Sequence, residues 1–240
     1  LPKDFTGFLT IRSQSGDVYI NKISNYCMVD VTAVSGDFLL AHSTLKRVQA
    51  DLKSGDIVIS NTSANVFHVN GHSGMLDSND VDAKEEISYH TISGNMELEN
   101  INTKNFFVDT KSGKIAVNGL TSENIDLVTD TGLMLLNNLT GSGNIKSDMG
   151  KINLSLAEKS KFNLSIQSKV GNISVNVPPA IFFKFKINTK KIGPTDFPLD
   201  AIIYGNDDYD KIEGYVGKEN STNLIDISSK VGKVSIKISN

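Results

Sequence analysis

The sequence predicts an all-β fold, specifically a single-stranded parallel β-helix (β-solenoid) with about 19–20 residues per coil and a right-handed course. Three observations predict it. A glycine recurs at nearly constant spacing, pairs of apolar residues flank that glycine at fixed distances, and the composition is rich in Ile, Val, Leu, Ser, Thr and Asn. These residue types favour strands and tight turns over helices.

The recurring glycine sets the length of each coil. Successive glycines are 18 to 21 residues apart as far as Gly171, and Gly232 follows 61 residues later, which is close to three further periods. Stacked parallel coils require such regularity, because a shift of one residue would turn an inward row of side chains outward. The turn glycines are Gly16, Gly36, Gly55, Gly74, Gly94, Gly113, Gly132, Gly150, Gly171 and Gly232.

Apolar pairs lie on both sides of each turn glycine. Leu9 and Ile11 precede Gly16, and Val18 and Ile20 follow it, with the same pattern in later coils. Residues spaced by two lie on one face of a strand, so each coil is expected to carry two strands joined by a Ser-Gly turn. A third apolar position supplies a third wall, and it is occupied by Ile23, Val81, Ile101, Leu120 and Leu139.

We expect residues 1–240 to form a single β-solenoid domain. Regular coils are predicted over about 5–177, an irregular excursion at about 193–211, and a closing coil at about 212–240. The excursion contains Pro194, Pro198 and the acidic residues Asp207, Asp208 and Asp210, and its sequence fits no coil.

Composition excludes several function classes. The formal net charge is -3 and no basic stripe occurs, which argues against a nucleic-acid partner. Cys27 is the single cysteine, so we expect it to be a packed core residue rather than part of a metal site or disulfide. No apolar run is long enough for a direct membrane span. The chain begins at Leu1, and we expect an extracellular or envelope-attached protein whose signal or anchor lies outside these residues.

Carboxylates, hydroxyls and imidazoles recur in the coils without forming a recognisable catalytic set. Asp17, Asp37 and Asp56 follow consecutive turn glycines and could attract Ca²⁺, although Asp after Gly also suits a solvated turn. The histidines lie at different positions in the coil, which argues against a shared metal; they are His42, His68, His72 and His90. A hydroxyl residue three positions before the glycine is expected to satisfy the turn backbone, as at Ser13, Thr91, Thr110, Thr129, Ser147, Ser168 and Ser229.

Short coils leave no room for the long loops that form a cleft in β-helical lyases and hydrolases. We therefore predict no catalytic residue, no cofactor and no bound metal, and we class the chain as not an enzyme.

One row of side chains is predicted to be an interaction surface. The third residue after each turn glycine lies between two inward residues and should face solvent, and it is apolar at Tyr19, Leu39, Val58, Ala116 and Leu135. Asp77 and Glu97 interrupt this row. Exposed apolar rows mark contact surfaces, so we expect a partner to cover it.

The iterated Ser-Gly-Asp-apolar-x-apolar unit at residues 15–20, 35–40 and 54–59, with a closing Gly-rich segment at 214–232, resembles the bacterial adhesin-like domain family of unknown function. The resemblance covers essentially the whole chain. It implies a β-helix-like solenoid in secreted or envelope-attached bacterial proteins, and it supplies no catalytic motif. The Asp of the unit is replaced at Met75, Lys114, Leu133, Lys151 and Lys233.

The leading interpretation is a non-catalytic cell-envelope or secreted surface module, an adhesin or structural scaffold, which binds a protein or glycan of the cell envelope and self-associates. One alternative is a polymerising β-helical scaffold protein. The other is a carbohydrate-active β-helix enzyme, which would need a groove with converging charged side chains beside the excursion.

Overall fold

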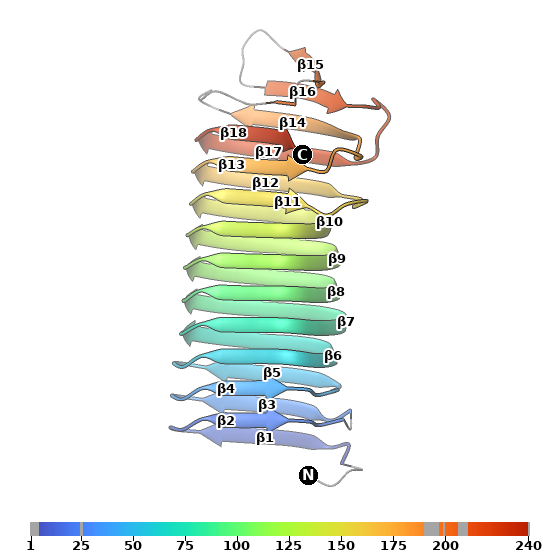
Figure 1. The fold of residues 1–240 in the computed structure, drawn as a ribbon. Helices are drawn as coiled ribbons and strands as arrows, with labels where there is room; N and C mark the ends of the chain where they lie inside the picture. The colour runs from blue at the N-terminus through green and yellow to red at the C-terminus, as the bar shows by residue number, and fades with distance from the viewer. Residues whose placement is uncertain (1–4, 25, 190–196, 199, 206–210, 240) are drawn as a thin grey trace. The chain divides into compact units, whose positions relative to one another are not determined.

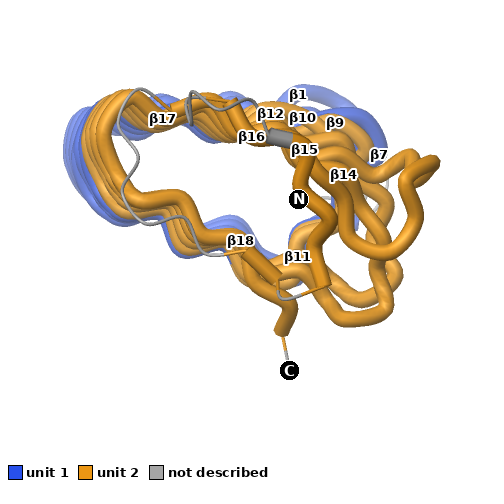
Figure 2. The backbone as a smooth tube through the Cα atoms, turned by 90° about the horizontal axis from the view of Figure 1, so that it is seen from above, with its two compact units in different colours: residues 1–117 blue, residues 118–240 orange. Residues whose placement is uncertain are grey.

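The computed structural model describes residues 5–24, 26–189, 197–198, 200–205 and 211–239. The regular secondary structure of these residues consists of β-strands, and it includes no helix long and apolar enough to cross a bilayer. The chain divides into two compact units, residues 1–117 and 118–240. Each unit is a stack of coils, and the coils within a unit follow nearly the same outline when viewed along the stack (Figures 1 and 2).

Unit 1 is a parallel stack in which every coil repeats the register of the one before. Val18 lies opposite Phe38, Phe38 opposite Ile57, and Ile57 opposite Leu76. The predicted parallel β-solenoid is therefore confirmed. Its strands are β1 (Phe8–Ser13), β2 (Val18–Asn21), β3 (Met28–Ala33), β4 (Phe38–Ala41), β5 (Arg47–Leu52), β6 (Ile57–Ser73), β7 (Leu76–Ser93) and β8 (Met96–Ser112), followed by β9 (Ile115–Thr131), which continues into unit 2.

Unit 2 continues the same coil pattern and then departs from it near the C-terminus. Ile152 lies opposite Ile173, and Ile173 opposite Val234, in parallel register. Its remaining strands are β10 (Met134–Met149), β11 (Ile152–Leu156), β12 (Asn163–Val170), β13 (Ile173–Val177), β14 (Phe183–Thr189), β15 (Ile202–Gly205), β16 (Lys211–Val216), β17 (Leu224–Val231) and β18 (Val234–Ile238).

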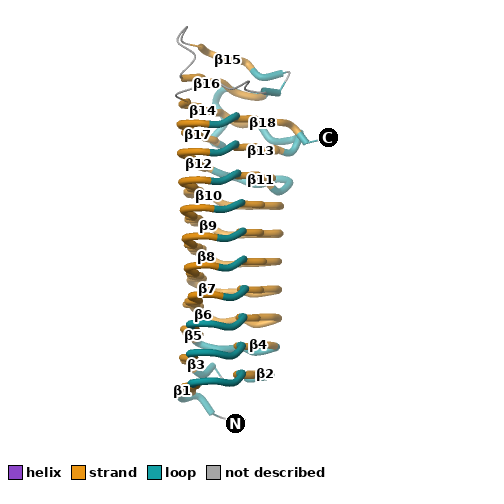
Figure 3. The backbone as a smooth tube through the Cα atoms, turned by 90° about the vertical axis from the view of Figure 1, so that its left-hand side faces the viewer, coloured by secondary structure: helices purple, strands orange, loops and turns teal. Residues whose placement is uncertain are grey.

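The turn glycines stack on one another within each unit, and Figure 3 shows their loops aligned in a column. Gly55 has φ of +117°, and a Cβ added to it would lie 2.1 Å from the carbonyl oxygen of Gly36. Both facts require glycine, because an L side chain is strained at this φ and would also collide with the coil beside it.

A second corner of the coil, six residues after the turn glycine, was not anticipated. Its backbone is left-handed, and Asn or Asp occupies it at Asn61, Asp80, Asn100 and Asn138. These are the non-glycine residues that tolerate positive φ best. This corner lets one continuous strand bend from one wall of the coil to the next, which explains the length of β6, β7, β8 and β10.

The interior is a continuous apolar core in each unit, built from the predicted inward pairs. Cys27 is fully buried, as expected of a packed residue, and desolvation raises the pKa of its thiol. Tyr89 is also buried, and its hydroxyl group lies 2.9 Å from the Ser78 hydroxyl. Its ring meets that of Phe106 edge to face, with ring centroids 6.4 Å apart.

The C-terminal region corrects the expected order of coils. Gly232 stacks directly on Gly171, with an added Cβ 2.0 Å from the Gly171 carbonyl oxygen, so the 61-residue gap is an insertion and not three periods. The strand β17 pairs in parallel with β12 on one side and β14 on the other. After Pro178 and Pro179 the chain thus skips one position in the stack. It returns later, and β17 fills that position.

The inserted segment adds an antiparallel layer to β14 of unit 2. The strand β16 pairs antiparallel with β14, and β15 pairs antiparallel with β16. Residues 202–205, which were expected to belong to a loop excursion, therefore form a strand, and the closing coil begins at Leu224 rather than at 212. The backbone groups along the edge of β14 explain this layer, because they require hydrogen-bond partners. Asp207, Asp208 and Asp210 lie outside the described residues.

Candidate interaction surfaces

The predicted outward row is aligned in register within each unit. In unit 1 Tyr19 lies opposite Leu39, and Leu39 opposite Val58. Tyr19 is 67% exposed, whereas Leu39 and Val58 are half-buried because each packs between neighbours in the row. Their side chains form one short apolar strip at the N-terminal coils of unit 1.

The rest of the row does not extend that strip. In unit 1 the row continues from Val58 to Asp77 and then Glu97, and Ala116 is half-buried one period further on. In unit 2 the half-buried Leu135 lies opposite a polar residue, Asn153.

The acidic residues of the row and their neighbours repel one another. Desolvation raises the pKa of the Asp77 carboxyl, and the charges of Glu97 and Glu99 act in the same direction. Lys114 forms an ion pair with Glu97 at 3.4 Å, which offsets part of this repulsion. The row therefore changes from apolar to acidic along unit 1.

The aspartates after the turn glycines have a structural role. The Asp37 N–H donates to Asp17 Oδ1 at 2.9 Å, and the Asp56 N–H donates to Asp37 Oδ1 at 2.8 Å. Met75, which replaces Asp in the next coil, still donates its N–H to Asp56 at 2.7 Å. A side-chain acceptor in one coil thus satisfies a backbone donor in the next, and the amide oxygen of Asn172 does the same for Lys233.

The histidines do not converge. His68 lies 3.2 Å from Glu86, and His90 lies 3.1 Å from Asp109. In the described part of the chain, no group of three or more His, Cys, Asp or Glu side chains could hold a metal ion.

The inward hydroxyl column changes within unit 2, where Thr129 still donates to the Thr131 carbonyl at 3.2 Å. Ser13 and Thr110 donate to backbone carbonyls near their turns, at 3.0 and 3.2 Å, as expected. In unit 2, Ser147, Ser168 and Ser229 are buried and have no hydrogen-bond partner among the described residues.

The residue just before the turn glycine also changes, and the sequence reasoning missed this. In unit 1 this position is Ser, and Ser35, Ser54 and Ser73 donate to backbone carbonyls of the neighbouring coil. In unit 2 it becomes apolar from Gly150 onward. Met149, Val170 and Val231 occupy it in register, with exposed fractions of 55%, 47% and 50%. The signal was visible as the loss of Ser before those three glycines.

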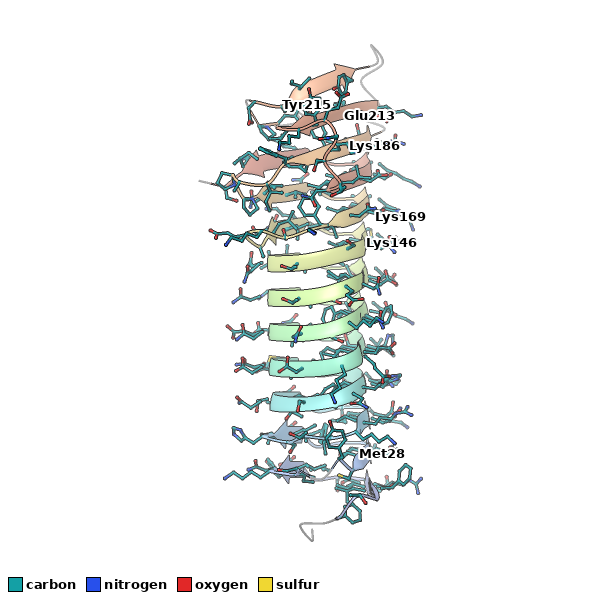
Figure 4. The ribbon with its side chains drawn as sticks, turned by 90° about the vertical axis from the view of Figure 1, so that its right-hand side faces the viewer. Met28, Lys146, Lys169, Lys186, Glu213 and Tyr215 are labelled. Atoms are coloured by element: carbon teal, nitrogen blue, oxygen red, sulfur yellow. The ribbon has the colours of Figure 1, made fainter. Side chains whose placement is uncertain are left out.

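Lysines lie on the same three strands as this apolar column. Lys169 forms an ion pair with Asp148 at 2.5 Å. This contact lowers the pKa of the Asp148 carboxyl, and the charges of Lys146 and Lys230 act in the same direction. Lys169 and Lys230 hold corresponding positions in neighbouring coils, because Ser168 pairs with Ser229 and Val170 with Val231. Figure 4 shows Lys146 and Lys169 on the same side of unit 2. We call Met149, Val170, Val231, Lys146, Lys169 and Lys230 the basic edge.

Unit 2 also has a pocket of about 460 Å³ at its C-terminal layer. Six of its eight lining residues are apolar, and its charged residues are Asp200 and Lys237. A glycoside hydrolase needs two carboxyl groups across the scissile bond, and the described lining supplies one. The lining residues are Pro179, Phe182, Phe197, Pro198, Asp200, Val216, Lys237 and Ile238.

The family model named Toastrack DUF4097 matches residues 1–85 and 62–237. No curated protein sequence matches the chain. A crystal structure of a putative cell adhesion protein from Clostridium sporogenes is 14% identical, covers 98% of this chain and 93% of its own, and has a TM-score of 0.28. From the family match, the chain belongs to the Toastrack DUF4097 family.

Proposed function

We propose that this chain is a non-catalytic surface or structural module of the bacterial envelope that presents its outward rows to a protein or glycan partner. The observation that carries the proposal is that polar side chains of the coils form hydrogen bonds and ion pairs within the fold. Carboxylates after the turns accept backbone N–H groups, and two histidines each face one carboxylate. The outward positions are the ones left to vary from coil to coil.

The apolar strip of Tyr19, Leu39 and Val58 supports a contact surface in unit 1. It combines a largely exposed aromatic ring with two half-buried aliphatic side chains in adjacent coils. Aromatic residues are common anchors of protein interfaces and also stack on sugar rings, which suits either class of partner.

Polymerisation through the C-terminal end of unit 2 is not favoured. Antiparallel pairing of β16 with β14 and of β15 with β16 interrupts the parallel repeat that a further coil would extend. We therefore retain binding, and not filament growth, as the proposed function.

The proposal is tested by measuring binding of the purified chain to immobilised envelope glycans and to intact bacterial cells, together with a screen for sugar release. Binding without product is expected. Tyr19→Ser/Leu39→Ser should weaken binding, whereas Phe107→Ser, which removes a 37% exposed ring from another face of unit 1, should not. Catalytic sugar release, or equal binding by all three proteins, would contradict the proposal.

A further inference from the structure

We infer that the basic edge of unit 2 docks on an anionic lipid surface. This inference deepens the proposed function, on which it rests, by naming a partner for one edge of the module. The edge consists of the exposed column Met149, Val170 and Val231 and the lysines of the same strands, Lys146, Lys169 and Lys230.

The apolar column has the geometry of a shallow membrane contact. Its three side chains lie in consecutive coil positions, about 4.8 Å apart along the stack, and each is about half exposed. No exposed aromatic ring lies in this column, and its aliphatic side chains suit insertion among acyl chains better than stacking on a sugar.

The surrounding charge selects an anionic surface. Three lysines lie on these strands, and Lys169 is paired with Asp148. The charges of Lys146 and Lys230 therefore add to this edge. Lysines near a bilayer are attracted to anionic headgroups, while adjacent apolar side chains enter the interface.

Charge is distributed unevenly along the chain. Residues 1–117 hold ten basic and fourteen acidic side chains, whereas residues 118–240 hold fourteen basic and thirteen acidic side chains. The net charge of -3 for the whole chain conceals this difference. At the position where unit 2 has its apolar column, unit 1 has hydrogen-bonded serines, so unit 1 provides an internal control.

The test uses the full chain in co-sedimentation with vesicles of phosphatidylcholine alone or mixed with phosphatidylglycerol. Binding is expected only to the mixed vesicles and should weaken with added salt. Lys146→Gln/Lys230→Gln should reduce the partition coefficient by roughly 25-fold, about fivefold for each lysine. Val170→Ser/Val231→Ser should reduce it several-fold and restore the residue type of unit 1. The matched control is Lys46→Gln/Lys53→Gln.

Circular dichroism and urea unfolding of each variant separate a lost contact from a lost fold. Absence of wild-type binding to the mixed vesicles, or equal loss in the control variant, would overturn the inference. Edge-dependent binding to soluble dextran sulfate without vesicle binding would also overturn it and assign the edge to an anionic polymer. Cell and glycan binding through the Tyr19 strip can persist in each case, so the two proposals fail independently.

Discussion

The glycine column offers a direct test of the stacked fold, because Gly16 and Gly55 have similar backbones and different surroundings. Their φ values are +103° and +117°. An added Cβ at Gly16 meets nothing within 4 Å, whereas one at Gly55 would lie 2.1 Å from the Gly36 carbonyl oxygen. Substitution by Ala therefore carries the same conformational cost at both positions and a collision at only one.

The expected loss of stability follows from the backbone conformation and from the hydrogen bonds that the collision would strain. An Ala at positive φ costs about 1–2 kcal/mol, which is the whole expected effect of Gly16→Ala. In Gly55→Ala the turn must also move away from its neighbour. That movement strains the bonds from the Ser54 hydroxyl to the Val34 carbonyl, 3.2 Å, and from the Asp56 N–H to Asp37, 2.8 Å. At about 1 kcal/mol or more for each bond, the total becomes about 3–5 kcal/mol.

The assay is urea unfolding followed by far-ultraviolet circular dichroism, with hydrogen exchange to detect unfolding confined to a few coils. Gly55→Ala should lower the unfolding midpoint clearly more than Gly16→Ala does. Equal losses in the two variants would refute the stacked column as the reason for the glycines.

Three further predictions concern polar groups. Tyr89→Phe should lower the free energy of unfolding, measured with urea, by about 1–2 kcal/mol, because it leaves the buried Ser78 hydroxyl without its partner. Adding Ser78→Ala should recover part of this loss. A larger loss in the double variant would contradict the reasoning. Asp77→Asn should raise the unfolding midpoint at neutral pH and leave it nearly unchanged at acid pH. The raised pKa of Asp77 means that folding weakens as pH rises through the unfolded-state value toward the folded-state value, and a pH-independent difference would refute this cause. Ser168→Ala should leave stability unchanged or raise it by about 1 kcal/mol, since the buried hydroxyl has no partner among the described residues. Calorimetric melting checks this, and clear destabilisation would reveal a hydrogen bond to that hydroxyl.

The resemblance to a bacterial β-solenoid family of unknown function is confirmed by the family match. The outward row lies in register within unit 1, and its apolar character is confined to a short strip because Asp77 and Glu97 occupy the adjoining coils. Its role as an interaction surface stays a prediction. The right-handed course, the partner and the place of the protein at the envelope remain predictions.

The sequence by itself determined the coil period, the inward pairs and the turn glycines. Each of these depends on local spacing, because a strand alternates its faces and a tight turn restricts φ. Only the tertiary structure decided that Gly232 stacks on Gly171 and that Val231 lies opposite Val170. Those relations join residues across a 61-residue gap. Because the repeat is periodic, the sequence does not specify which two coils become neighbours, and strand pairing decides it.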